Sequence, residues 1–234
     1  MLNAIVLFAL AAVPVIVAIT LHEAAHGYAA LALGDDTARR AGRLSLNPLR
    51  HVDRVGTILL PGALLLGQIL TLGRVVFMFG WAKPVPVSAW RFRHPRQGMA
   101  VVAAAGPAMN FFLAWLTALV LHATGTVRGM AGETIDQVLT LFILSNLVLG
   151  LFNLLPVPPL DGGRIVVGML PERLALAWAG LERAGLVIVL LVVFLLPRLL
   201  AEFGIRWDPV GAGLAHVLPW AENLIYRLAG WNGG

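Results

Sequence analysis

Long apolar segments alternate with short polar segments along most of this 234-residue chain. A helix needs about 20 apolar residues to cross a hydrocarbon core about 30 Å thick. The pattern therefore predicts an all-α polytopic membrane protein, a bundle of about four to six transmembrane helices. The clearest predicted spans, each with at most one charged residue, are Ala4–Leu33, Gly98–His122, Gln137–Leu155 and Ala184–Leu200.

A further uncharged segment, Val55–Gly73, is interrupted by Pro61 and by several glycines. A single crossing here would place the basic residues of the range 83–96 on the opposite side of the membrane from the arginine-rich loop Thr37–Arg54. That arrangement would conflict with the positive-inside rule. We therefore favour a re-entrant or broken helix that returns to its starting side, with a full span as the alternative. Irregular backbone at membrane depth is tolerated only where protein or a water-filled cavity surrounds it, so we expect such a cavity here.

Two other segments have an open structural interpretation. Gly80–Val87 contains Pro84 and Pro86, which exclude a helix, so we expect an extended segment. It could form a short membrane-embedded β element with an edge for an extended peptide, or an ordinary proline-rich loop. The amphipathic segment Asp208–Gly230 could lie in the membrane interface or form a weak additional span. We expect one integral-membrane domain over residues 1–234, with a core at about 4–170 and C-terminal helices at about 171–234.

Composition supports the membrane assignment, because 59% of the residues are hydrophobic and 12% are charged. The formal net charge of +5 comes from arginines in short loops, a distribution that sets membrane topology and does not indicate nucleic-acid binding. The loop Thr37–Arg54 holds five arginines, which assigns it to the cytoplasm and the N-terminus to the outside. We expect a multi-pass protein of a bacterial or archaeal cell membrane, with its site towards the cytoplasmic side.

The first span contains the stretch His22-Glu23-Ala24-Ala25-His26, in which Glu23 is the only formal charge of the whole span. An ionisable group at membrane depth costs roughly 2.5 to 3.5 kcal/mol on insertion scales, so this group requires a stabilising partner, and a metal ion is the best candidate. On a helix, His22 and His26 share one face and can reach a single ion. Glu23 is rotated by about 100° and is better placed beside the metal-bound water, as in zinc hydrolases.

A catalytic zinc site has three protein ligands and one open position. The chain contains no cysteine, so the third ligand must be another histidine or a carboxylate. Asp161 is the stronger candidate, because it follows a long uncharged stretch and lies between a proline break and two glycines. A helix N-cap is an alternative or additional role for Asp161. The remaining histidines lie in basic loops or towards the other side of the membrane: His51, His94, His122 and His216.

Three motifs occur together in this apolar chain. They are the His-Glu motif on a predicted transmembrane helix, Ala105-Gly106-Pro107 on a later core helix, and the stretch Asn153–Gly162, which reads NLLPVPPLDG. Together they resemble the site-2 protease family of intramembrane zinc metalloproteases. The match covers roughly Leu10–Leu170 and is similar to compact members without a PDZ or CBS domain.

The resemblance implies a ligand set and a reaction. His22, His26 and Asp161 would bind one catalytic Zn²⁺, and Glu23 would act as general base and acid. The substrate would be a peptide bond in or near a transmembrane segment of another membrane protein. The resemblance also implies a role in substrate binding for Asn153 and for an extended edge formed by Pro84, Val85, Pro86 and Val87, which would hold an unwound substrate.

Two other asparagines lie in the predicted core helices. Asn110 could bind substrate or help to stabilise an oxyanion, and interhelical hydrogen bonding explains it equally well. We expect Asn146 to be structural.

We therefore expect an intramembrane zinc metalloendopeptidase that acts in regulated intramembrane proteolysis and is embedded in a lipid bilayer. The alternative is a metal-binding transporter or scaffold without hydrolysis. A transporter would require further carboxylates along a crossing path, whereas the core spans supply only Glu23 and, at the end of a segment, Asp161. The sequence leaves the identity of the substrate and the oligomeric state open.

Overall fold

The computed structural model describes residues 2–75, 80–124 and 130–231. In these ranges the chain forms helices, turns and extended connections, with no β-strand. The prediction of an all-α polytopic membrane protein is confirmed. Five helical segments of the described chain are long and apolar enough to cross a membrane, namely Ala12–Ala32, Arg54–Thr71, Pro95–Thr124, Gly132–Asn153 and Ala184–Glu202.

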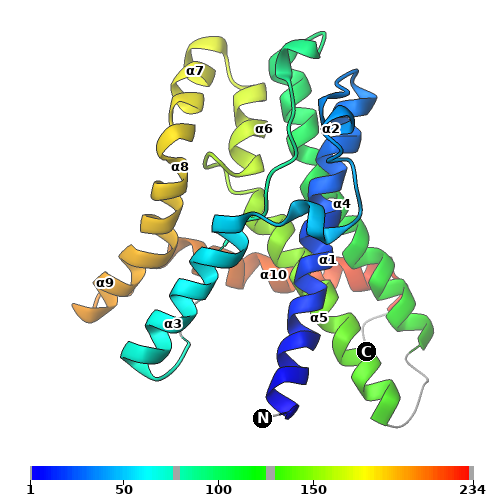
Figure 1. Ribbon diagram of the computed structural model, residues 1–234, viewed down its shortest axis with the longest axis vertical. Coiled ribbons are helices and arrows are strands. Elements are labelled where there is room, and N and C mark those ends of the chain that lie inside the picture. Colours follow the sequence, from blue (N-terminus) through cyan, green and yellow to red (C-terminus); the bar gives the residue numbers. More distant parts are fainter. Residues whose placement is uncertain (1, 76–79, 125–129, 232–234) are drawn as a thin grey trace.

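Three helices form the centre of the bundle: α1 (Leu2–Ala32), α4 (Pro95–Thr124) and α5 (Met130–Asn153) (Figure 1). Many of the buried residues of α1 and α4 are alanines or polar residues. Small side chains let helix backbones approach closely, which is how helices associate where lipid removes the hydrophobic driving force. Large apolar side chains instead lie on the exposed surface of these helices, including Val13, Ile16, Phe112, Leu116 and Val120.

The apolar segment after the arginine-rich loop is a helix with an irregular start. It begins with the π-helical turn η2 (Arg54–Leu59) and continues as α3 (Leu60–Leu72). The helix ends at Gly73, whose φ of 65° lies in the left-handed region that glycine adopts most readily.

The two ends of this segment lie side by side. The Trp81 N–H donates a hydrogen bond to the Gly56 carbonyl oxygen (3.1 Å), and the Thr57 hydroxyl donates to the Trp81 carbonyl oxygen (2.9 Å). The residues just before the helix and those just after the segment therefore lie at the same depth in the bundle. This geometry agrees with the expected re-entrant or broken helix and not with a single crossing.

The segment Gly80–Val87 is extended, but the short β element that the sequence allowed does not form in the described chain. Pro84 and Pro86 have no N–H to donate to a strand partner. The Val85 N–H between them donates instead to the Glu23 carboxylate, over 3.0 Å from N to Oε2. The segment is therefore fixed by a side chain of α1.

Helices α4 and α5 extend beyond the predicted spans Gly98–His122 and Gln137–Leu155 into the polar segment between them. Helix α4 continues to Thr124, and α5 begins at Met130 rather than at Gln137. Glu133 lies in the first turn of α5, where a carboxylate interacts favourably with the helix dipole. The polar residues in the first turns of α5 interrupt the run of apolar residues, but the helix continues through them.

The last apolar run is helical from Glu182 to Glu202. It comprises α8 (Glu182–Val189), the π-helical turn η4 (Leu190–Leu195) and α9 (Leu196–Glu202), and it covers the predicted span Ala184–Leu200. The remaining short elements are α2 (Thr37–Arg40), the 3-10 turns η1 (Pro48–His51) and η3 (Ala89–Arg91), and α7 (Glu172–Gly180).

The amphipathic C-terminal segment forms α10 (Pro209–Leu228), which lies across the long helices rather than parallel to them (Figure 1). Its buried residues Ala221 and Ile225 pack in a cluster with Ala114 and Ala118 of α4 and Leu147 of α5. Among the described helices, α10 is not one of those with the length and hydropathy of a membrane span. The structure therefore agrees with the interfacial alternative.

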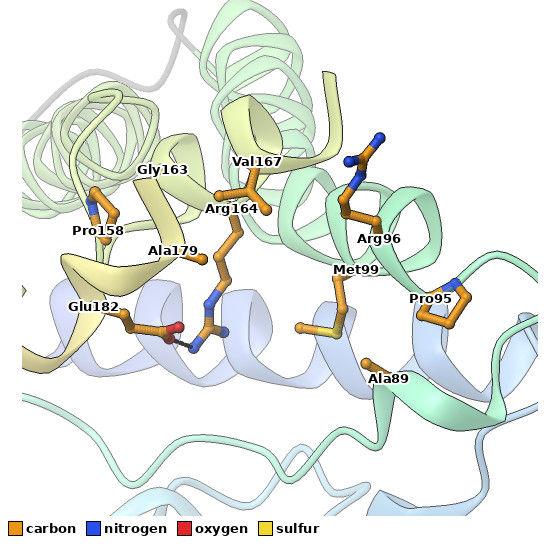
Figure 2. Close-up of a pocket in the computed structure, with 10 residues that line it drawn as sticks. All are labelled: Ala89, Pro95, Arg96, Met99, Pro158, Gly163, Arg164, Val167, Ala179 and Glu182. Atoms are coloured by element: carbon orange, nitrogen blue, oxygen red, sulfur yellow. Dashed lines mark hydrogen bonds and ion pairs between the residues drawn. The ribbon is translucent and has the colours of Figure 1, made fainter. Parts of the chain in front are cut away.

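Helix α6 (Asp161–Met169) follows the proline-rich turn and leads to α7 and α8. Arg164 of α6 pairs with Glu182 of α8, over 2.6 Å from Nη2 to Oε1 (Figure 2). This ion pair lies at a cavity of about 330 Å³, here called the flanking cavity. The flanking cavity is lined by Ala89, Pro95, Arg96, Met99, Pro158, Gly163, Arg164, Val167, Ala179 and Glu182.

Candidate metal centre and active site

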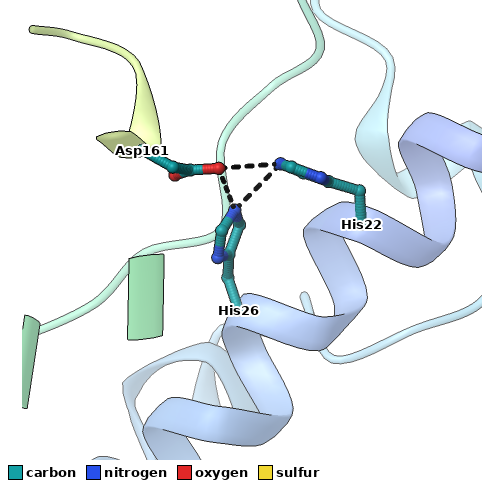
Figure 3. A group of neighbouring side chains, drawn as sticks. All are labelled: His22, His26 and Asp161. Atoms are coloured by element: carbon teal, nitrogen blue, oxygen red, sulfur yellow. Dashed lines mark hydrogen bonds and ion pairs between the residues drawn. The ribbon is translucent and has the colours of Figure 1, made fainter. Parts of the chain in front are cut away.

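The two histidines of the first span project from one face of α1 towards α6 (Figure 3). They are four positions apart in the sequence, so they lie about one helical turn apart, and their Nε2 atoms are 3.1 Å apart. Asp161, the first residue of α6, points its carboxylate at both rings. Its Oδ2 atom is 3.1 Å from His22 Nε2 and 3.4 Å from His26 Nε2.

This triangle of atoms has the size of a tetrahedral zinc site. Zinc bonds of about 2.0 to 2.1 Å place two ligand atoms about 3.3 Å apart. The observed separations are 3.1, 3.1 and 3.4 Å. In addition, Asp161 Oδ2 is buried and makes no hydrogen bond. A buried carboxylate oxygen without a hydrogen bond is costly unless a cation compensates it, so the three residues fit a metal ion.

The outer nitrogen of each histidine has a partner that fixes the ring. His22 Nδ1 lies 2.6 Å from Asn110 Oδ1, and His26 Nδ1 lies 2.8 Å from the Val102 carbonyl oxygen. Both partners are acceptors in this arrangement, so each ring carries its proton on Nδ1 and directs the Nε2 lone pair towards the centre. Such outer partners are typical of metal-binding histidines.

Asn110 is buried and engaged at both ends of its amide group. Its Nδ2 donates to Asn146 Oδ1 over 2.9 Å, and Asn146 Nδ2 donates in turn to the Phe142 carbonyl oxygen over 2.8 Å. Asn110 therefore forms interhelical hydrogen bonds, which is one of the two roles that the sequence left open for it. Asn146 makes a structural contact in the same network. The chain of bonds links α1, α4 and α5 beneath His22.

Gly106 of α4 provides the space for the two rings. A Cβ atom at this position would lie 2.5 Å from Cε1 of both His22 and His26. Separations below 3.0 Å between such atoms require a shift of the neighbour, so α4 can approach the histidines this closely only with glycine here. This explains the physical role of Gly106 in the Ala105-Gly106-Pro107 motif.

Two glycines position Asp161 in a similar way. A Cβ atom on Gly162 would lie 2.2 Å from the Leu154 carbonyl oxygen, and one on Gly163 would lie 2.5 Å from Pro158 N. The turn that follows α5 thus packs directly on the first turn of α6. The Asp-Gly-Gly sequence is needed because α6 begins against this backbone.

Glu23 lies beside the triangle and not in it. Its carboxylate accepts the Val85 N–H, and it lines a central cavity of about 330 Å³ together with the histidines and Asp161. Asn153, Pro84, Val85 and Val87 also line the central cavity, whereas Pro86 is not among its lining residues. The Asn153 amide donates to the Leu149 carbonyl oxygen over 3.0 Å. Their roles in substrate binding stay predictions.

The other histidines do not join the cluster in the described chain. His51 is buried and its Nε2 lies 2.8 Å from the Ser45 carbonyl oxygen. His122 packs edge-to-face on Trp231, with ring centroids 5.3 Å apart. The structure thus favours Asp161 over the four histidines as the third member of the group.

The residues that hold the extended segment were not predicted from the sequence. Asp35, fully buried after α1, accepts the Ser88 N–H at Oδ2 (2.6 Å) and the Thr37 N–H at Oδ1 (3.0 Å). Arg91 Nε lies 3.7 Å from Asp35 Oδ1. Burial raises the pKa of the Asp35 carboxyl, but these donors and the Arg91 charge lower it by more, so the pKa lies below its usual value. Only the acidic pair Asp35-Asp36 after the helix could have signalled this contact.

Comparison with known proteins identifies the relatives of this chain. Residues 124–196 match the model of Peptidase family M50. The chain is 40% identical over 210 residues to the "Putative zinc metalloprotease YwhC" of Bacillus subtilis, which covers 88% of each chain. It is 29% identical over 215 residues to the "Putative zinc metalloprotease Rip2" of Mycobacterium tuberculosis, covering 91% of this chain and 77% of the relative. No solved structure matches the chain.

These relatives and the geometry point to the same chemistry. The similarity to the Bacillus subtilis protein covers most of both chains, and the described residues bring together a His-His-Asp group that could hold a metal ion. The alternative of a transporter or scaffold has no such support. This multi-pass membrane protein therefore belongs to peptidase family M50, the site-2 proteases, and is a zinc metalloprotease.

Proposed function

We propose that this zinc metalloprotease hydrolyses peptide bonds in or near transmembrane segments of other membrane proteins. The observation that carries the proposal is the position of the His-His-Asp group. His22 and His26 lie within Ala12–Ala32, a helix long and apolar enough to span a membrane, and α4 and α5 pack beside it. A substrate that reaches this centre must itself enter the bilayer.

His22, His26 and Asp161 are the residues that would hold the ion. A bound zinc ion supplies a Lewis acid and a water of lowered pKa. Glu23 lines the same cavity without joining the ligand group, so its carboxylate is free to take the proton of the attacking water and return it to the leaving amine. The Val85 N–H fixes one oxygen of that carboxylate.

The extended segment beside Glu23 is the proposed substrate-binding edge. A substrate helix hides its own peptide carbonyls, so it must unwind before hydrolysis, and an extended neighbour can stabilise the unwound form by main-chain hydrogen bonds. Pro84, Val85 and Val87 face the central cavity. Asn153, at the end of α5, supplies an amide on the same cavity.

The basic loops set the proposed orientation. Arg39, Arg40 and Arg43 lie near the end of α1 that carries the histidines, and the positive-inside rule assigns them to the cytoplasm. Water for hydrolysis would then enter from the cytoplasmic side of a cell membrane. No nucleic-acid partner is needed for this function.

The test is a Glu23→Gln variant of the full chain, purified with zinc and assayed on a model single-span membrane substrate. We expect wild-type zinc content and a loss of cleavage of about 10²- to 10⁴-fold, the usual contribution of a general base. Glu133→Gln, the same substitution at the start of α5 and outside the cavities, is the matched control. Wild-type cleavage by Glu23→Gln would overturn the role of Glu23. Failure of the wild type to cut any membrane substrate would overturn the proposed function.

A further inference from the structure

The flanking cavity adjoins the central cavity. Met99 of α4 and Arg164 of α6 line both of them, so the two side chains form the boundary between the two spaces. The flanking cavity continues from this boundary towards Ala89 and Pro95, which precede and begin α4 (Figure 2). A peptide chain that leaves the central cavity on this side would enter the flanking cavity.

The position of Arg164 follows from the helix that carries the third member of the metal group. Arg164 lies three residues after Asp161, so both project from one face of α6. One guanidinium N–H of Arg164 donates to the Glu182 carboxylate over 2.6 Å (Figure 2). A guanidinium carries five donors, so this side chain has the capacity to bind a second carboxylate.

The ion pair between Arg164 and Glu182 is easily exchanged. Their side chains are 42% and 45% exposed, and ion pairs at such sites contribute little net stability. A carboxylate of a bound peptide could therefore replace Glu182 at little cost. When no peptide is bound, Glu182 holds the Arg164 side chain extended at the boundary between the two cavities.

The lining of the flanking cavity has a net positive charge. Its charged residues are Arg96, Arg164 and Glu182, and its other members are apolar or lack side-chain charge. Such a space suits a chain segment that combines apolar residues with an acidic one. It disfavours the basic residues that flank most transmembrane segments on the cytoplasmic side.

We propose that the flanking cavity binds the polar flank of the substrate and that Arg164 recognises an acidic side chain there. The inference rests on the proposed function and adds a rule of substrate choice to it. Membrane proteins with ordinary basic flanks would be poor substrates, because Arg96 and Arg164 repel them. Those with an acidic flank would be preferred.

The experiment uses the purified full chain with zinc and three model substrates that differ only at one flank position, which carries Glu, Gln or Arg. We expect kcat/KM to fall in that order, by roughly three- to tenfold per step, because a partly exposed charge-assisted hydrogen bond contributes about that much. The difference should appear mainly in KM. Scanning the flank position along the substrate locates the residue that meets Arg164.

Variants of the ion pair test the assignment. Arg164→Gln should make the three kcat/KM values equal, and since the readout is their ratio, a general loss of activity does not imitate it. Glu182→Gln removes the internal competitor and should increase the preference for Glu, which keeps the proposal testable if Arg164→Gln fails to fold. Arg173→Gln, which removes the same charge from the nearby α7 and lies outside both cavities, should keep the wild-type ratios.

The possible failures are distinguishable. If wild type cuts all three substrates equally well at every flank position, or if Arg164→Gln keeps the wild-type ratios, the recognition by Arg164 is wrong and the proposed function stands. If wild type cuts none of them or any other membrane substrate, the proposed function itself is overturned, and the inference with it.

Discussion

The metal-binding half of the site and the extended segment that faces it are held in place in different ways. His22, His26 and Asp161 are fixed by close helix packing, with Gly106 against both rings and Asn110 beneath one of them. The segment Gly80–Val87 and the adjoining Ser88 are fixed by a few hydrogen bonds to side chains and loop backbone. Close packing holds the first half in place, whereas the second depends on a few hydrogen bonds, and it is this second half that the proposed function assigns to substrate binding.

A Gly106→Ala substitution should disturb the metal-binding half of the site and leave the extended segment unchanged. The added Cβ lies 2.5 Å from the Cε1 atoms of His22 and His26, so the rings or α4 must shift. We expect zinc affinity to fall by about 10- to 100-fold, the cost usually seen when the surroundings of ligands are disturbed. Zinc titration with a competing chelator measures it. Gly213→Ala on α10, where the new Cβ meets nothing within 4 Å, should leave zinc affinity unchanged. Equal affinities in all three proteins would contradict the tight packing at Gly106.

An Asp35→Asn substitution should act on the extended half instead. Asparagine offers only one acceptor oxygen, while the native carboxylate uses both of its oxygens for the N–H groups of Ser88 and Thr37. One donor then faces an NH₂ group, and we expect the segment near Val85 to loosen. Cleavage should fall about three- to tenfold, mainly through KM, because part of the about 1 to 3 kcal/mol cost of an unsatisfied buried donor should appear as weaker substrate binding.

Zinc content is the discriminating measurement for Asp35→Asn, since it should equal that of wild type. An equal loss of zinc would show that the two halves are not held independently. Asp36→Asn, at the neighbouring, partly exposed position, should have a smaller effect on KM.

The smallest expected effect is on stability in acid. The folded-state pKa of Asp35 is lowered, so its contribution to stability is complete above the unfolded value of about 3.9 and is lost as the pH falls through the lower folded value. The stability difference between wild type and Asp35→Asn should therefore be constant from about pH 7 to 5 and shrink below about pH 4. Thermal unfolding in one detergent across this range measures it. A difference that grows on acidification would contradict the sign.

The features of the fold that depend on local sequence patterns could be predicted from the sequence. The apolar segments gave the helical class, and the charge rule applied to Val55–Gly73 predicted the hairpin whose ends meet at Gly56 and Trp81. The start of α5 was missed because its first turns are polar and amphipathic patterning stops before the helix does. Of the two alternatives for Gly80–Val87, the described chain shows the extended loop and no strand, because its prolines remove donors that a strand needs.

The site could be predicted in part for the same reason. The His-Glu motif and the Asn153–Gly162 stretch are compact in sequence, so the group of His22, His26 and Asp161 was expected before its geometry was known. The contact of Asp35 with Ser88 joins residues 53 positions apart, and that of His22 with Asn110 joins residues 88 positions apart. No local pattern marks such pairs.

We expect His22, His26 and Asp161 to hold one zinc ion together. The most direct measurement is the zinc content of purified wild type, His22→Ala and Asp161→Ala, with Asp136→Ala on α5 as a control outside the cavities. We expect about one zinc per chain in wild type and the control, and at most about a tenth of that in the two site variants, because removing a ligand costs more than disturbing an outer partner. Unchanged zinc content in both site variants would contradict it.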